Sequence, residues 1–102
     1  MIVVTRENER AVIRPEGEDV VASSVPEIRA SMRTAMANGA SELVVDLALV
    51  RMVDSMGIGL LISAHNSLRK TGGKLSVIHA SEEIRDLFET MRIHQHFQVS
   101  GD

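Results

Sequence analysis

The feature that most limits the fold of this chain is the run Leu43-Val44-Val45-Asp46-Leu47, which shows no alternation of apolar and polar residues. A strand with one solvent-exposed face alternates between apolar and polar residues, whereas a strand that is apolar on both faces is covered on both faces. Such a strand belongs at the centre of a sheet, with parallel neighbours that are reached through helices. The run therefore indicates an α/β fold.

Segments with strand and helix periods alternate along the rest of the chain. Short strands are expected at 2–5, 11–14 and 75–78, the first two as a hairpin, and a short edge strand at 97–99 would complete the set. Apolar residues at helical spacing predict three helices. Their stripes are Ile28, Met32, Ala35 and Met36; Ile58, Leu61, Ile62, His65 and Leu68; and Ile84, Leu87, Phe88 and Met91. The order predicts a mixed sheet of four to five strands with right-handed crossovers and helices packed on it.

Capping signals mark the ends of the predicted helices. Ser24 and Glu27 have the spacing of a capping box, and Pro26 falls in the first turn, where a missing N–H costs little. Asn38-Gly39 ends the first helix, and Gly72-Gly73 ends the second. Ser81 is the expected N-cap of the third helix.

Composition limits the class of protein. The 102 residues suit one domain over residues 1–102, and the absence of cysteine excludes disulfides and thiolate metal sites. A net charge of −3, with no Trp or Tyr, argues against binding to nucleic acid or to an anionic membrane. No apolar run approaches the ~20 residues of a membrane span, and the N-terminus does not resemble a signal peptide. We therefore expect a cytoplasmic protein.

The segment Asp54-Ser55-Met56-Gly57-Ile58-Gly59 is the least ordinary part of the sequence. A serine stands where a loop turns into a helix, and two glycines follow although each costs about 1 kcal/mol in a helix interior. Ser55 can be an N-cap, or it can be a phosphoacceptor at a helix N-terminus, where free N–H groups tolerate an anion. The two interpretations are compatible.

Catalysis and metal binding have little support in the sequence. His65 lies about three turns along the second helix, ~15 Å from Ser55, which is too far to accept its proton. His94-Gln95-His96 lacks a further ligand and is typical of a solvated turn. Asp46 is expected near Ser55 at the carboxyl edge of the sheet, but no pocket for acid–base chemistry is evident. We expect neither an enzyme nor a cofactor.

Four segments resemble the STAS domain family, and in particular its single-domain bacterial anti-sigma factor antagonists. They are Leu43–Leu47, Asp54–Leu61, Lys70–Leu75 and Ile84–Phe88. The resemblance extends over nearly the whole chain and implies a STAS-like α/β fold.

The resemblance also implies a partner switch. In such a switch the unphosphorylated antagonist binds an anti-sigma factor, a serine kinase of the GHKL type, and the sigma factor is released. Phosphorylation of the serine that matches Ser55 ends the binding, and a serine phosphatase restores the antagonist. Asp19 corresponds to a family aspartate near the acceptor serine, although it comes one residue early, and Met56 stands where a small residue is common.

The expected docking surface is the exposed start of the second helix. Its residues are Asp19, Asp54, Ser55, Met56, Gly57, Gly59 and Leu60, and Leu60 is included because it lies off the predicted inner stripe. Two alternatives stay open. One is a STAS scaffold that is not phosphorylated, either a sensor of a ligand or nucleotide or a subunit of a larger complex; the other is a small enzyme.

Overall fold

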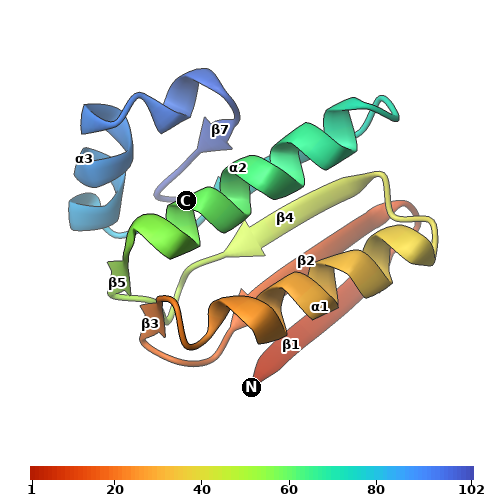
Figure 1. Ribbon diagram of the computed structural model, residues 1–102, viewed down its shortest axis with the longest axis horizontal. Helices are drawn as coiled ribbons and strands as arrows, with labels where there is room; N and C mark the ends of the chain where they lie inside the picture. Colours follow the sequence, from red (N-terminus) through yellow and green to blue (C-terminus); the bar gives the residue numbers. More distant parts are fainter.

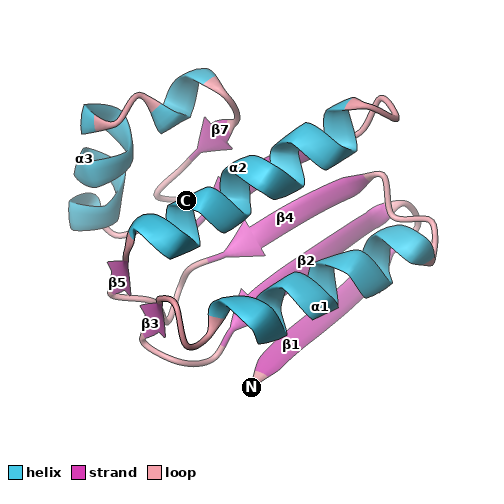
Figure 2. Ribbon diagram, viewed as in Figure 1, coloured by secondary structure: helices cyan, strands magenta, loops and turns pink.

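The computed structural model describes residues 1–102 as an α/β fold with one five-stranded and one two-stranded sheet (Figures 1 and 2). The elements in chain order are β1 (Ile2–Glu7), β2 (Arg10–Pro15), β3 (Asp19–Val20), α1 (Val25–Ala37), β4 (Glu42–Asp46), β5 (Met52–Val53), α2 (Ser55–Arg69), β6 (Lys74–Ile78), α3 (Glu82–Thr90), a short 3₁₀ helix η1 (Ile93–Gln95) and β7 (Gln98–Val99). The predicted mixed sheet is confirmed.

The large sheet has the strand order β1-β2-β4-β6-β7. β1 and β2 form the predicted antiparallel hairpin, and every other neighbouring pair is parallel. β4 lies at the centre, as its apolar run predicts. α1 and α2 lie side by side over one face of the sheet, and α3 and η1 lie toward the β7 edge (Figure 1). None of these helices is both long enough and apolar enough to cross a membrane.

The two faces of β4 are covered differently, which corrects one expectation. Leu43 and Val45 face the helices and belong to the main core. Val44 points to the opposite face and stays outside that core, yet it is only 2% exposed. Its neighbours in register are Val12 and Ser76. Cross-strand neighbours thus bury Val44, so a run that is apolar on both faces does not require a helix on each face.

Capping follows the sequence at α3 and departs from it at α1. The Ser81 side chain accepts a hydrogen bond from the Ile84 N–H, as expected of an N-cap. Ser24 precedes α1, but its hydroxyl accepts from the Val21 N–H and makes no cap bond to the helix. The predicted capping box is therefore wrong, since the hydroxyl is already used by the turn before the helix. Gly39 ends this segment with a φ of +94°.

Two methionine predictions differ in outcome. Met32 is buried in the core, whereas Met91 is 47% exposed at the end of α3. The helix ends one residue earlier, at Thr90, so Met91 leaves the apolar stripe. Met36 is half-buried against the core.

Candidate partner-binding and phosphorylation site

The start of α2 is held by the small two-stranded sheet. β3 and β5 pair in parallel, so that Asp19 lies opposite Met52 and Val20 lies opposite Val53. The Asp54 N–H donates to the Val20 carbonyl at 3.2 Å and extends this pairing to the edge of the helix. The sheet therefore brings two segments more than 30 residues apart in sequence, that of Asp19 and that of Ser55, to one end of the molecule.

Asp54 is the N-cap of α2. Its Oδ1 accepts from the Gly57 N–H at 3.0 Å, and its Oδ2 accepts from the Ala22 N–H at 3.3 Å. One carboxylate thus fixes both the helix start and the segment that leads from β3 to α1. Ser55 is the first residue of the helix, so its interpretation as the N-cap is wrong. Asp and Ser are both favoured caps, and the sequence could not choose between them.

The backbone around Ser55 leaves hydrogen-bond donors free for an anion. The helical ladder begins with the Ile58 N–H, which donates to the Asp54 carbonyl. The N–H groups of Ser55 and Met56 precede this ladder and have no partner inside the helix. The Asp54 carboxylate already occupies the Gly57 N–H, so two N–H groups of the first turn are left without a partner beside an exposed Ser55 side chain.

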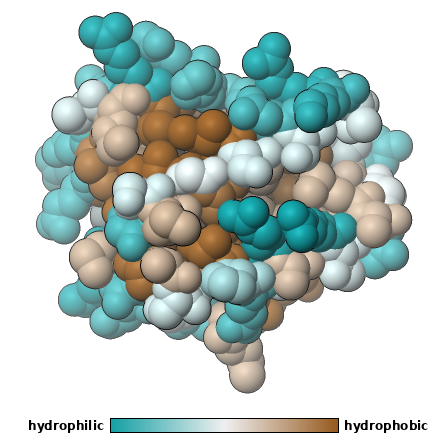
Figure 3. All heavy atoms as spheres, viewed as in Figure 1, coloured by the Kyte–Doolittle hydropathy of each residue, from teal (hydrophilic) through white to brown (hydrophobic).

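Exposed apolar side chains flank Ser55. Met56 is 53% exposed and Met52, on β5, is 52% exposed. Leu49, in the loop that leads to β5, is also exposed. Figure 3 shows hydrophobic residues on both sides of the pale row of small and polar side chains that follows α2. Met52 is not among the docking residues that the sequence predicts, and its alternation with buried Val53 is the only signal for it.

Two of the predicted docking residues are buried, which corrects the predicted surface. Leu60 is 2% exposed because α1 covers this side of α2; it lines a small cavity of about 50 Å³ with Met32 and Met36. Gly57 is also buried, and a Cβ there would lie 2.5 Å from the Val20 carbonyl oxygen. The glycine thus permits α2 to start tightly against β3.

The remaining predicted residues lie at the surface. Gly59 is exposed, and an added Cβ would meet nothing within 4 Å. Asp19 is exposed on β3, and Asp54 is half-buried. The exposed surface that we name the α2-start surface therefore consists of Asp19, Met52, Asp54, Ser55, Met56 and Gly59.

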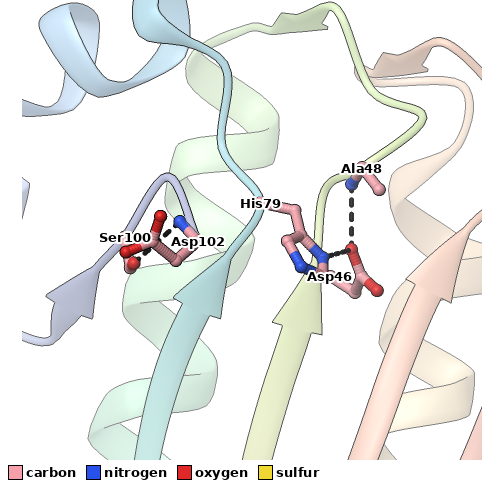
Figure 4. Close-up of polar contacts among 5 residues, drawn as sticks. All are labelled: Asp46, Ala48, His79, Ser100 and Asp102. Atoms are coloured by element: carbon pink, nitrogen blue, oxygen red, sulfur yellow. Dashed lines mark hydrogen bonds and ion pairs between the residues drawn. The ribbon is translucent and has the colours of Figure 1, made fainter.

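Asp46 is engaged by a different partner from the one expected (Figure 4). Its Oδ1 lies 2.8 Å from His79 Nδ1 and accepts from the Ala48 N–H at 2.9 Å. His79 has a φ of +56°, in the left-handed region. No hydrogen bond joins Asp46 to Ser55, so this carboxylate fixes the turn after β4 rather than the α2-start surface.

His65 lies toward the other end of α2, against the C-terminal part of the chain. Its ring is 6.1 Å from that of His96 and 5.7 Å from that of Phe97, measured between centroids. Desolvation lowers the pKa of His65 below its ordinary value, and the charges of Arg69 and His96 lower it further. The nearby surface hollow of about 440 Å³ contains none of the predicted site residues. No group of three or more His, Asp or Glu side chains is arranged to hold a metal ion.

Comparison with known proteins assigns the family. The STAS domain model matches residues 2–101, and the chain therefore belongs to the STAS domain family. A search of curated proteins finds no match.

Solved structures of anti-sigma factor antagonists share the fold. SpoIIAA in its unphosphorylated form is 22% identical, with a TM-score of 0.83 over 100% of this chain and 89% of that one. The Bacillus cell fate determinant SpoIIAA in its phosphorylated form is 22% identical, with a TM-score of 0.77 over 100% of this chain and 92% of that one. An anti-sigma factor antagonist of Mycobacterium paratuberculosis is 19% identical, with a TM-score of 0.86 over 100% of this chain and 86% of that one.

Proposed function

We propose that this chain is an anti-sigma factor antagonist that works by exchange of partners. Its unphosphorylated form binds an anti-sigma factor that is also a serine kinase of the GHKL type, and the sigma factor is then released. Transfer of a phosphoryl group from ATP to Ser55 Oγ ends the binding, and a serine phosphatase restores the hydroxyl. We place this exchange in the cytoplasm, where ATP is available to the kinase.

The observation that carries the proposal is the exposed Ser55 hydroxyl on the first residue of α2. A kinase must reach this oxygen, and the Asp54 cap holds it at a fixed place without using it. The likeness to SpoIIAA, which has been solved in unphosphorylated and phosphorylated forms, supports the same cycle here.

The surroundings of Ser55 explain how a phosphate would act on binding rather than on folding. A phosphate adds about −1.5 to −2 charges at neutral pH. The free N–H groups and the dipole of α2 favour an anion at this position, which offsets part of the repulsion from Asp54. A partner that covers Met52 and Met56 would have to desolvate the new charge, at a cost of several kcal/mol.

Incubation of the protein with ATP and a cognate serine kinase of the GHKL type tests the proposal. We expect intact-mass and fragment spectra to show one phosphate on Ser55 and none in Ser55→Ala. Ser63→Ala is a matched control, because Ser63 is exposed on the same helix and should leave the reaction unchanged.

Binding to the kinase gives a second measurement. The phosphoprotein should bind about a hundredfold more weakly than the unmodified protein. A wild-type chain that takes up no phosphate but remains in a stable complex would favour the alternative, a STAS scaffold or ligand-sensing subunit that does not switch. Turnover of a small-molecule substrate would instead contradict the non-enzymatic role.

A further inference from the structure

The two edges of the large sheet are protected to different degrees. β7 forms one edge and is only two residues long, whereas β1 forms the other with six residues, Ile2–Glu7. Long, regular edge strands pair with other chains unless proline, lysine, a bulge or a covering element prevents it. β1 contains neither proline nor lysine, and its register with β2 runs without a bulge from Ile2 opposite Pro15 to Glu7 opposite Arg10.

Strand geometry shows which backbone groups of β1 face outward. The tight turn pairs Glu7 with Arg10, and the Glu16 N–H donates to the Met1 carbonyl at the other end. Odd-numbered residues of β1 therefore exchange hydrogen bonds with β2, and the even-numbered residues direct their N–H and C=O away from the sheet. These residues are Ile2, Val4 and Arg6. No strand pairs with the outer side of β1, although the C-terminal half of α1 crosses in front of β1 and extends past it (Figure 1).

The side chains along this edge do not block it. Val4 is 46% exposed, so an apolar β-branched side chain stands at its centre. Arg6 is drawn back: its Nε donates to the Asn8 carbonyl at 2.6 Å, and its Nη1 donates to the Asn38 carbonyl at 3.3 Å, at the end of α1. The one cation among the outward-facing residues is thus tied to carbonyls of its own chain.

We propose that the β1 edge is the dimerisation surface of this protein, pairing antiparallel with β1 of a second copy. The two-fold axis passes through Val4, so that Val4 opposes Val4, Ile2 opposes Arg6 and Val3 opposes Thr5 of the other copy. About six new main-chain hydrogen bonds join the two sheets into one. The start of α2 lies away from β1 and stays free in both copies (Figure 1), whereas Asp19 lines a small pocket with Met1 and Ile2 near one end of β1.

A second copy is the occupant because this register is self-complementary. It opposes no two like charges, and its pairs are dominated by β-branched residues, which favour cross-strand contact. If the two β1 strands are shifted by two residues toward the hairpin turn, the two-fold axis passes through Thr5. Thr5 then opposes Thr5, and Val4 opposes Arg6 of the other copy. A further shift of two residues places Arg6 directly against Arg6, which is unfavourable.

Sedimentation velocity over a concentration series tests the dimer. We expect the wild type to shift from monomer to dimer in the micromolar to millimolar range, because a single strand pair is a small interface. Val4→Pro should abolish the dimer. Proline removes only an N–H that points outward, and an edge position tolerates it. Val4→Thr keeps that N–H and the β-branched shape, so it should dimerise like the wild type.

Crosslinking identifies the register. The chain has no cysteine, so Val4→Cys introduces a single thiol. Paired residues at the axis lie about 5.5 Å apart between Cα atoms, within the range of a disulfide. Oxidised Val4→Cys should run as a covalent dimer, and Thr5→Cys should crosslink at least tenfold less. A wild type that is monomeric throughout, a dimer that survives Val4→Pro, or preferential crosslinking through Thr5 would each overturn the proposal. A dimer that survives Val4→Pro would point to another surface, and crosslinking through Thr5 would point to a shifted register of β1 against β1.

Discussion

At the scale of single residues, the α2-start surface depends on Asp54 more than on the serine beside it. The Asp54 carboxylate accepts one bond from its own helix and one from the segment after β3. Because both oxygens are used for this purpose, the Ser55 hydroxyl is left without a structural role. The exposed Ser55 side chain thus stands on a rigid support, and we expect this support to stay the same when the hydroxyl is modified.

The two glycines of this segment have different roles, which substitution by alanine will separate. Gly57→Ala places a methyl group 2.5 Å from the Val20 oxygen and 2.8 Å from a Val53 side-chain carbon, and we expect it to lower the free energy of unfolding by about 1–3 kcal/mol. Gly59→Ala meets open space and should raise it by up to about 1 kcal/mol, since alanine is the better helix former. Urea denaturation measures both. Equal effects would contradict the close approach at Gly57.

Leu60 and Met56 differ in burial, and substitution of each by alanine will separate a role in stability from a role in binding. Leu60→Ala empties space between α2 and α1 and should cost about 2–5 kcal/mol of stability. Met56→Ala, at an exposed position, should change stability by less than about 0.5 kcal/mol and weaken binding to the kinase. Chemical denaturation and titration calorimetry report the two quantities. Normal binding by Met56→Ala would remove this methionine from the docking surface.

At the scale of elements, α2 joins the candidate site to the C-terminal part of the chain. Its first turn rests on β3 through Gly57, and near its other end His65 packs against His96 and Phe97, in the segment between η1 and β7. The helix also contacts β6 and α1. The position of Ser55 therefore depends on packing over the whole helix and not on the local loop alone.

The contact of His65 with the C-terminal segment predicts a dependence of stability on pH. The pKa of His65 in the folded protein is lowered from about 6.5, first by desolvation and then by Arg69 and His96. Below about pH 6.5 the unfolded chain binds more protons than the folded one, so stability is full above that pH and falls as the pH drops toward the folded pKa.

Paired denaturation curves between about pH 7 and pH 5 test this dependence. His65→Gln should reduce the loss of stability at lower pH, because this substitution removes the group with the lowered pKa. His94→Gln is the control, since His94 is exposed and its loss should leave the slope unchanged. A wild type and a His65→Gln variant with parallel profiles would contradict the assignment.

What the sequence can predict at this scale depends on which neighbours an element meets. Hydrophobic periods located the hairpin, the central strand and all three helices. They placed Leu60 on the outside because the predicted stripe considers one buried face, whereas α1 covers a second side of α2. The pairing of Asp19 with Met52 carries no local signal either, since both strands have only two residues. The sequence could not predict that Asp54 is the N-cap, because Asp54 and Ser55 are adjacent and both are favoured caps.

At the scale of the whole molecule, the groups that could carry a switch lie at one end of the fold. Parallel strands β3 and β5 deliver Asp19 and Asp54 to the same edge, next to the start of α2. The β1 edge lies on another side of the sheet (Figure 1). This arrangement separates the proposed site of phosphorylation from the strands of the large sheet that hold the core together.

This separation predicts that phosphorylation of Ser55 leaves global stability almost unchanged. The phosphate gains the first-turn N–H groups and the helix dipole, worth about 0.3–1 kcal/mol, and loses a similar amount to repulsion by the Asp54 carboxylate. Because Ser55 makes no hydrogen bond that the phosphate would break, the two effects are the only ones expected. The melting temperature of the phosphoprotein should lie within about 4 °C of that of the unmodified chain.

Differential scanning calorimetry with far-UV circular dichroism measures that difference. Ser55→Ala is the control for loss of the hydroxyl, and it should also melt close to the wild type. A higher salt concentration should reduce any remaining difference in melting temperature. The repulsion acts between exposed or half-exposed charges, and salt screens it. A phosphoprotein that melts far below the wild type would mean that the modification acts by loosening α2. The surface-charge mechanism would then be wrong, even if the kinase modifies Ser55.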